Sequence, residues 1–154
     1  MAKLERTIEI DASPEDVYDV LTDPNCLGEW VTIQEALVEA PDPPLTEGDC
    51  VVQRMKVVGK RFEVSWDVEV ADRPKKVRWS GDGPMGSKAR ATYELESNGN
   101  GGTRFSYTNE YDVPGGPVGK VAGRALVQAS GREADATLKR LKEFVERKHG
   151  NDGG

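Results

Sequence analysis

Residues 60–71 read KRFEVSWDVEVA, and apolar and polar side chains alternate strictly along this stretch. The apolar set is Phe62, Val64, Trp66, Val68 and Val70, and the polar set between them is Arg61, Glu63, Ser65, Asp67 and Glu69. A period of two is typical of a β-strand that turns one face to an apolar core and the other to water. This stretch therefore predicts a sheet with one covered face.

The segments on both sides of this stretch extend it into a run of antiparallel strands. Gly59 predicts a hairpin turn between residues 49–58 and 60–71, and the glycine-rich residues 98–102 predict the last hairpin turn of the chain. The proline-rich residues 41–44 end an earlier strand. Further strands are predicted at residues 3–11, 31–40, 75–80, 88–96 and 103–112.

Two short helices are predicted directly after the first strand. Ser13 is suited to cap a helix and Pro14 to occupy its first position, and the acidic residues Glu15 and Asp16 complement the helix dipole. A second helical turn is predicted at residues 24–30.

The pattern changes from period two to helical period after residue 117. A helix of about residues 118–148 carries one apolar stripe, formed by Val127, Ala134, Leu138, Leu141 and Val145. The order of elements predicts an α+β fold, with a curved antiparallel sheet and this long C-terminal helix against one sheet face. We expect residues 1–149 to form a single domain and residues 150–154 to form a disordered tail.

Composition narrows the classes of function. The chain of 154 residues has a formal net charge of −6, whereas nucleic-acid binding requires clustered positive charge. No apolar run approaches the roughly 20 residues that span a bilayer, and the N-terminus lacks a signal-peptide core. We therefore expect a cytoplasmic protein that binds no nucleic acid and does not insert into a membrane. Cys26 and Cys50 are interpreted as reduced thiols, and no metal or cofactor is predicted.

Segments spread over nearly the whole chain resemble the START-like (SRPBCC) polyketide cyclase/dehydrase and lipid-transport superfamily. The matching pieces are residues 8–18 (IEIDASPEDVY), Asp23-Pro24 followed by Trp30, residues 102–105 (GTRF) and residues 138–142 (LKRLK). The resemblance implies the helix-grip fold, in which a curved antiparallel sheet wraps around the long C-terminal helix and leaves a cavity between them. It does not settle function, because the superfamily includes ligand carriers, cyclases and regulators.

The cavity implied by this resemblance has a candidate lining. Tyrosine and tryptophan combine apolar contact with one hydrogen bond, which suits a mostly apolar pocket with a few polar points. Gln53 and Asn109 are candidate polar anchors, with a hydrogen bond to backbone at a bulge as the alternative. The predicted ligand-binding residues are Trp30, Gln53, Met55, Trp66, Trp79, Tyr93, Tyr107, Asn109, Tyr111, Val121 and Ala125.

Small residues are concentrated in the first half of the final helix, and they have more than one explanation. They are Gly119, Ala122, Gly123, Ala125, Ala129 and Gly131. Glycine inside a helix costs about 0.5–1 kcal/mol relative to alanine, so a structural reason is needed. A void for a ligand is one reason, and close helix–sheet packing or a helix break near Gly131 is the other.

Several polar features have a functional and a simpler interpretation. Glu35 is either a partly buried carboxylate with a raised pKa or an edge-strand charge in solvent. The row Arg124, Gln128 and Arg132 would neutralise an acidic ligand or would be solvent-exposed. Residues 81–88 form a flap over the cavity or a plain hairpin loop. They do not match a phosphate-binding loop, because Ser87 precedes Lys88 and a strand follows.

Three functions are consistent with these observations. The preferred one is a binding or carrier protein for a hydrophobic small molecule such as a lipid, a polyketide or another aromatic compound. The second is a polyketide cyclase or dehydratase, with Tyr93, Tyr107 or Tyr111 as proton donor. The single histidine, His149, lies near the C-terminus, so a Ser-His or Cys-His catalytic pair is not expected. The third is a protein-interaction module of a stress- or toxin-like regulator.

Overall fold

The computed structural model describes residues 2–57, 59–83 and 86–149. Its elements in chain order are β1 (Ala2–Ile10), α1 (Pro14–Leu21), the 3-10 turn η1 (Pro24–Cys26), α2 (Leu27–Trp30), β2 (Gln34–Glu39), β3 (Cys50–Val57), β4 (Lys60–Asp72), β5 (Lys76–Asp82), β6 (Lys88–Ser97), β7 (Thr103–Asp112) and α3 (Gly116–His149). The predicted tail at residues 150–154 lies outside the described residues.

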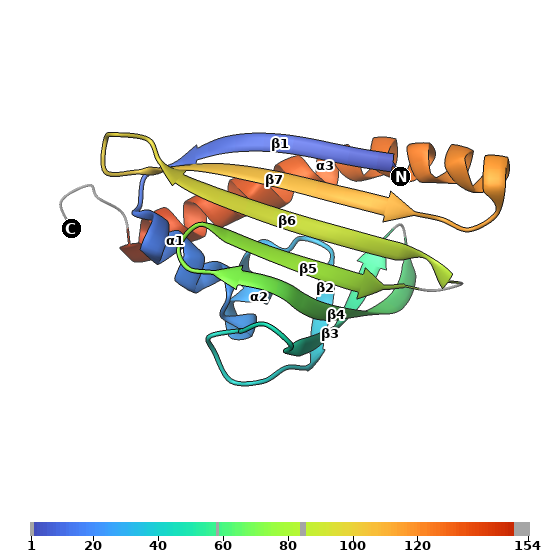
Figure 1. Ribbon diagram of the computed structural model, residues 1–154, viewed down its shortest axis with the longest axis horizontal. Helices are drawn as coiled ribbons and strands as arrows, with labels where there is room; N and C mark the ends of the chain where they lie inside the picture. The colour runs from blue at the N-terminus through green and yellow to red at the C-terminus, as the bar shows by residue number, and fades with distance from the viewer. Residues whose placement is uncertain (1, 58, 84–85, 150–154) are drawn as a thin grey trace.

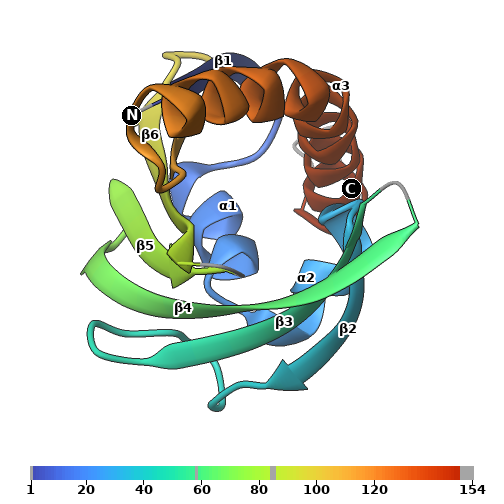
Figure 2. The same cartoon turned by 90° about the vertical axis from the view of Figure 1, so that its right-hand side faces the viewer.

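The strands form one open antiparallel sheet, which over the described residues has seven strands in the order β1-β7-β6-β5-β4-β3-β2. The sheet curves strongly, and α3 closes its open side (Figures 1 and 2). The predicted α+β architecture is therefore confirmed, including the two short helices after the first strand. The alternation that was used to predict β4 is also present, because Val64, Trp66 and Val68 are buried and the residues between them are exposed.

The short helical segments α1, η1 and α2 lie within the curve of the sheet (Figure 2). The Ser13 hydroxyl accepts a hydrogen bond from the Asp16 backbone amide at 3.2 Å, so Ser13 is the N-cap of α1 as predicted. Pro14 occupies the first turn of the helix. The apolar side chains of these segments enter the core, namely Val17, Val20, Leu21, Leu27 and Trp30.

The second half of α3 is fixed to the first strand. Ala134, Leu138, Leu141 and Val145 of the predicted stripe are buried, and the side chain of Val127 lies outside the described ones. Lys142 Nζ donates to the Glu9 carbonyl at 2.9 Å, and the Asp11 amide donates to a Glu146 carboxylate oxygen at 2.8 Å. The buried stripe and these polar contacts hold the same stretch of helix against β1.

Most of the described side chains in the first half of α3 are far more exposed. Val118 and Val121 are 77% and 59% exposed. Figure 1 shows the first turns of α3, in orange, beyond the ends of β1 and β7, and Figure 2 shows the helix changing direction between its orange and red halves. The helix nevertheless continues through Gly131, so a break at this glycine is not present. None of the described helices is both long and apolar enough to cross a bilayer.

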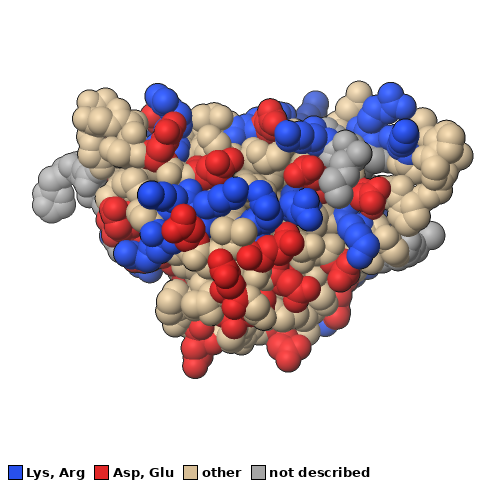
Figure 3. Space-filling view, viewed as in Figure 1, with Lys and Arg blue, Asp and Glu red and all other residues tan. Residues whose placement is uncertain are grey.

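Acidic and basic side chains are interleaved on the outer face of the sheet (Figure 3). Lys88 lies 3.0 Å from Asp82 and Arg104 lies 3.2 Å from Glu9, each on a neighbouring strand, and Arg90 of β6 reaches Glu69 of β4 across β5 at 3.3 Å. Exposed pairs of this kind contribute at most about 1 kcal/mol each. These surface pairs do not indicate a binding site on the outer face.

Candidate functional site

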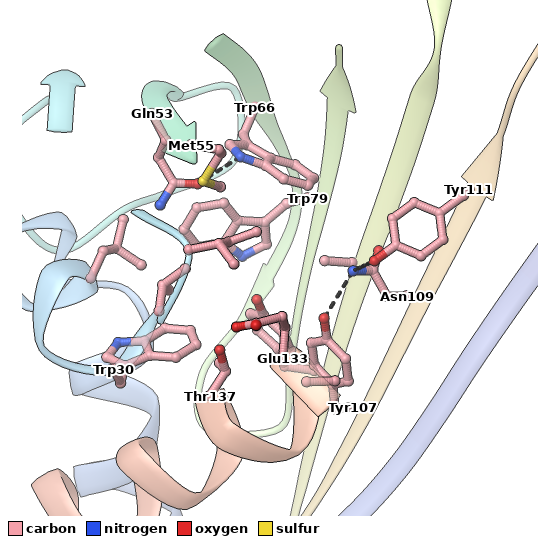
Figure 4. Close-up of a pocket in the computed structure, with 16 residues that line it drawn as sticks. Trp30, Gln53, Met55, Trp66, Trp79, Tyr107, Asn109, Tyr111, Glu133 and Thr137 are labelled. Carbon is pink, nitrogen blue, oxygen red and sulfur yellow. Dashed lines mark hydrogen bonds between the residues drawn. The ribbon is translucent and has the colours of Figure 1, made fainter. Parts of the chain in front are cut away.

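A cavity of about 110 Å³ lies between the concave face of the sheet and the middle of α3. The sheet supplies residues from β3 to β7, α2 and the segment after it supply one side, and α3 supplies the rest (Figure 4). The lining consists of Leu27, Trp30, Val31, Ile33, Gln53, Met55, Trp66, Trp79, Ala91, Tyr93, Tyr107, Asn109, Tyr111, Glu133, Ala134 and Thr137. Most of this lining is aromatic or aliphatic.

Nine of the eleven residues predicted to bind a ligand line this cavity. They are Trp30, Gln53, Met55, Trp66, Trp79, Tyr93, Tyr107, Asn109 and Tyr111. The prediction is wrong for Val121 and Ala125, which are exposed and do not line it. The physical reason is position along the helix, since these residues belong to the turns that extend past the strand ends (Figure 1).

A row of aromatic rings crosses four adjacent strands on the concave face. Trp66 of β4 and Trp79 of β5 meet edge to face at 6.3 Å between ring centroids, and Trp79 meets Tyr93 of β6 at the same distance. Tyr93 stacks on Tyr107 of β7 at 5.6 Å. Trp30 of α2 contacts Tyr93 edge to face at 6.2 Å. Such pairs contribute about 0.5–1.5 kcal/mol beyond the burial of their area, so the wall is rigid.

Room for the two large indoles comes from small residues on the next strand. Trp66 pairs across the sheet with Gly81, and Trp79 pairs with Ala91. A Cβ atom at Gly81 would lie 2.6 Å from the Trp66 ring, so only glycine permits this ring position. A tryptophan on one strand with a glycine or alanine at the paired position of the next strand could have located the cavity from the sequence, and we did not use this feature.

The small residues of α3 have a different explanation from the one suggested by the resemblance. A Cβ atom at Gly119 would lie 2.2 Å from the Val113 carbonyl oxygen, so this glycine allows close packing of the helix start on the preceding turn. Ala122 is exposed, as is Ala125. The side chains at positions 123 and 129 lie outside the described ones. For the described positions, therefore, a ligand void does not explain the small residues.

On the strands, the described polar side chains of the cavity form two separate hydrogen-bonded groups. Trp66 Nε1 donates to Gln53 Oε1 at 2.8 Å, and the amide of Gln53 donates in turn to Gln34. Asn109 Nδ2 donates to the hydroxyl oxygens of Tyr107 and Tyr111, both at 2.8 Å. Both amides therefore bind side chains, which decides against the alternative of a backbone bond at a bulge.

Burial raises the pKa of two tyrosines in the cavity. The pKa of Tyr93 lies well above its ordinary value because the phenol is desolvated and lies near Tyr107 and Tyr111. Burial also raises the pKa of Tyr107, and this effect exceeds the opposing effect of its hydrogen bond with Asn109. Both phenols stay neutral at physiological pH and act as hydrogen-bonding groups there. A general acid works best with a pKa near the operating pH, so these shifts do not favour proton transfer.

The rim of the cavity is formed by α3 and the segment that precedes β2. Thr32 Oγ1 donates to a Glu133 carboxylate oxygen at 2.9 Å, and the Thr32 amide donates to Thr137 Oγ1 at 3.2 Å. Glu133 is exposed, and it contributes the one ionisable carboxylate of the described lining. These contacts join two elements that are about 100 residues apart in sequence.

Glu35 and the helical row Arg124, Gln128 and Arg132 take their simpler interpretation. Glu35 is exposed and forms an ion pair with Arg61 at 2.6 Å. Gly83 donates its amide to the Ser87 carbonyl at 2.9 Å, while Pro84 and Met85 lie outside the described residues. Cys26 and Cys50 are free cysteines. The helical row Arg124, Gln128 and Arg132 is exposed to solvent.

Sequence reasoning did not assign seven residues to the lining. They are Leu27, Val31, Ile33, Ala91, Glu133, Ala134 and Thr137. The last three lie within about one turn of α3. The apolar stripe of the helix includes Ala134, but the stripe alone does not show where along its length the helix crosses the sheet.

Comparison with known proteins agrees with this fold. An uncharacterised protein of Mycobacterium tuberculosis is 32% identical over 149 residues, which cover 95% of this chain and 98% of the relative. A second Mycobacterium tuberculosis protein, named a toxin, is 25% identical over 128 residues, covering 82% and 88% of the two chains.

Among solved structures, the Zhui aromatase/cyclase from Streptomyces sp. R1128 matches with a TM-score of 0.79 at 17% identity, covering 99% and 98% of the two chains. The Aha1 dimer from Colwellia psychrerythraea matches with a TM-score of 0.66 at 20% identity, covering 95% and 97%. At such identities the likeness concerns the fold. The family described as polyketide cyclase / dehydrase and lipid transport matches residues 1–146, and this chain therefore belongs to that family.

Proposed function

We propose that this protein binds one hydrophobic small molecule in the cavity between the sheet and α3, and carries it without chemical conversion. The observation that carries the proposal is the aromatic cavity itself, in which Trp30, Trp66, Trp79, Tyr93 and Tyr107 present their rings to one space. Concave, mostly apolar pockets with few polar groups are the usual small-molecule sites of proteins. The raised pKa of Tyr93 and Tyr107 supports binding over acid–base chemistry.

The size of the cavity limits the ligand. At about 110 Å³ the space is smaller than the engineered cavity of roughly 150 Å³ that holds benzene in another protein. A lipid chain would need the rim between Thr32 and Glu133 to open. A compact ring compound fits with much less rearrangement.

The test is native mass spectrometry of freshly purified protein, followed by solvent extraction of any bound compound. A matched pair of variants on α3 shows where the compound binds. Ala134 lines the cavity and Ala125 is exposed, so Ala134→Leu fills the site and Ala125→Leu makes the same change in solvent. We expect Ala134→Leu to lower occupancy about tenfold or more and Ala125→Leu to leave it unchanged. An unliganded mass that stays unshifted with a panel of lipids and polyphenols would contradict the proposal.

A cyclase-type reaction is the second candidate, and one observation favours it. Asn109 holds the hydroxyl groups of Tyr107 and Tyr111 at one side of the cavity, where they would contact a bound poly-β-keto chain. The fold likeness to an aromatase/cyclase supports the same idea. If the protein converts such a substrate to product and the Tyr107→Phe variant does not, the protein is an enzyme and the carrier proposal is wrong.

Regulation through a protein partner is the third candidate. Val118 and Val121 form an exposed apolar pair on α3, and one relative is named a toxin. A Val121→Asp variant that loses a cellular growth phenotype, while Ala134→Leu keeps it, would favour this candidate over ligand carriage.

A further inference from the structure

Residues that line the cavity carry buried polar atoms without a partner in the described part of the protein. Among the described residues, the buried side-chain atoms without a hydrogen-bond partner are Trp30 Nε1, Trp79 Nε1 and Asn109 Oδ1. All three residues line the cavity. The great majority of buried polar side-chain atoms in proteins are paired. Where such an atom faces the cavity, as Trp79 Nε1 does in Figure 4, its partner comes from outside the chain.

The indole of Trp66, next to Trp79, has a hydrogen-bond partner within the protein. Trp66 on β4 donates its Nε1–H to Gln53 at 2.8 Å, whereas Trp79 on β5, only 4% exposed, has no such partner. Figure 4 shows the nitrogen of Trp79 directed into the space between Trp30 and Tyr107, and the nitrogen of Trp30 on the far side of its ring. Trp79 is thus the donor that a molecule in the cavity would meet.

The chemistry of an indole restricts that molecule. The Nε1–H group donates and does not accept, so the molecule must supply an acceptor atom. No lysine or arginine is among the described lining residues, and the carboxylate of Glu133 lies at the rim. An anion buried there would lack a compensating charge, so the acceptor is a neutral oxygen.

The inference rests on the proposed function and narrows its ligand. We propose that the cavity binds a neutral compound of about one ring that carries a carbonyl oxygen, and that this oxygen accepts a hydrogen bond from Trp79 Nε1. The aromatic walls hold the ring, and the volume of about 110 Å³ limits its size. Trp79 is the residue that selects a carbonyl compound over a hydrocarbon of the same shape.

Two probes of almost the same shape test this selection. Acetophenone carries a carbonyl group where α-methylstyrene carries a carbon–carbon double bond. The chain has three tryptophans, so a ¹H–¹⁵N spectrum contains three indole signals, which single Trp→Phe variants assign. We expect acetophenone to move the Trp79 indole proton downfield and α-methylstyrene to leave it near its starting position. We also expect acetophenone to bind about threefold to tenfold more tightly, as one net hydrogen bond allows.

Matched variants separate the hydrogen bond from the shape of the site. Trp79→Phe should remove the preference for acetophenone and keep the affinity for α-methylstyrene within about twofold, because the aromatic wall remains. Trp66→Phe removes an N–H group that already has a partner in the protein, so it should keep the preference.

The outcomes distinguish this inference from the proposed function. Equal affinity of the wild-type protein for both probes, with no downfield movement of the Trp79 signal, would overturn the inference and leave hydrophobic binding intact. Failure of both probes and of the wider ligand panel would overturn both. Benzoate that binds more tightly than acetophenone would contradict the neutral character of the ligand.

Discussion

The two halves of α3 have the same helical backbone but opposite environments. From Ala134 onward the helix buries Leu138, Leu141 and Val145 against the sheet, and its polar contacts reach the first strand. Before that point Val118 and Val121 are exposed to solvent. One half is therefore part of the core, and the other extends beyond the strands (Figure 1).

The cavity lies at the boundary between these halves. Glu133, Ala134 and Thr137 line it, and among the described side chains of the helix Ala134 is the first of the buried apolar row. Since the first half leaves the sheet there, the concave face beneath it is only partly covered. A helix that is long and bent thus closes the core at one end and leaves a cavity in the middle.

The largest expected effect contrasts one apolar residue from each half. Leu141 is fully buried, so Leu141→Ala should lower the free energy of unfolding by about 2–5 kcal/mol through lost burial and a cavity. Val121 is 59% exposed, so Val121→Ala should change it by less than about 0.5 kcal/mol. Urea unfolding followed by tryptophan fluorescence measures both values. If both variants lose a similar free energy of unfolding, the two halves of α3 do not differ in burial as described.

This contrast shows why the sequence predicted the strands better than the helix. Alternation assigns each strand residue to a face, and β7 is observed at the predicted residues 103–112. Of the nine predicted residues that line the cavity, eight lie on strands, and that rule placed them on the concave face. A helical stripe shows which residues share a face and does not show where along its length the helix meets the sheet. Val121 and Ala125 were therefore assigned to the cavity in error.

Other features of the site depend on contacts between distant segments. Residues 31–33 were predicted to begin a strand, yet β2 begins at Gln34, because Val31 caps α2 and Thr32 binds α3. Whether an indole is paired depends on which side chain its nitrogen reaches: Trp66 Nε1 reaches Gln53, two positions along β3 from its cross-strand partner, and Trp79 Nε1 reaches no described protein group. No local pattern in the sequence encodes such pairings.

The second prediction concerns the turn at which the first half begins. Gly119→Ala places a methyl group 2.2 Å from the Val113 carbonyl oxygen and 2.7 Å from that of Pro114, and both are backbone atoms. We expect a loss of about 1–3 kcal/mol in the free energy of unfolding, as for other overpacked sites. An unchanged value would mean that the first turn unwinds at almost no cost, and hence that this half is not packed at all.

The third prediction uses pH to test the polar contacts of the second half. Burial raises the pKa of Glu146, but hydrogen bonds from Lys142 and the Asp11 amide outweigh it, so the net pKa is lowered. The pKa of a glutamate in the unfolded protein is about 4.3, and the pKa of Glu146 in the folded protein is lower. The ionised carboxylate therefore stabilises the folded protein at a pH above the unfolded-state pKa, and this stabilisation is lost as the pH falls through the folded-state pKa. Glu146→Gln should therefore cost about 1 kcal/mol at pH 7.

The difference between wild type and Glu146→Gln should shrink in acid, because protonation removes the same charge from the wild-type protein. Chemical unfolding at a series of pH values from neutral to about 3 measures the difference. Glu143→Gln, an exposed change on the same helix, is the control and should show little effect at any pH. A difference that stays constant with pH would show that the charge of Glu146 does not hold α3 to β1.

The smallest effect is expected at Gly131, near the junction of the two halves. A Cβ atom there would lie 3.2 Å from Arg6 Nη2, the end of a flexible side chain that can move by a few tenths of an ångström. Alanine is the better helix former by up to about 1 kcal/mol, so Gly131→Ala should raise the free energy of unfolding by roughly 0.5 kcal/mol. Arg6 also binds Asp135 at 2.8 Å, and an Arg6→Ala background removes the only close neighbour of the new methyl group among the described atoms. If Gly131→Ala destabilises the protein in both backgrounds, the bend of α3 itself requires glycine, and the two halves are joined by a specific hinge.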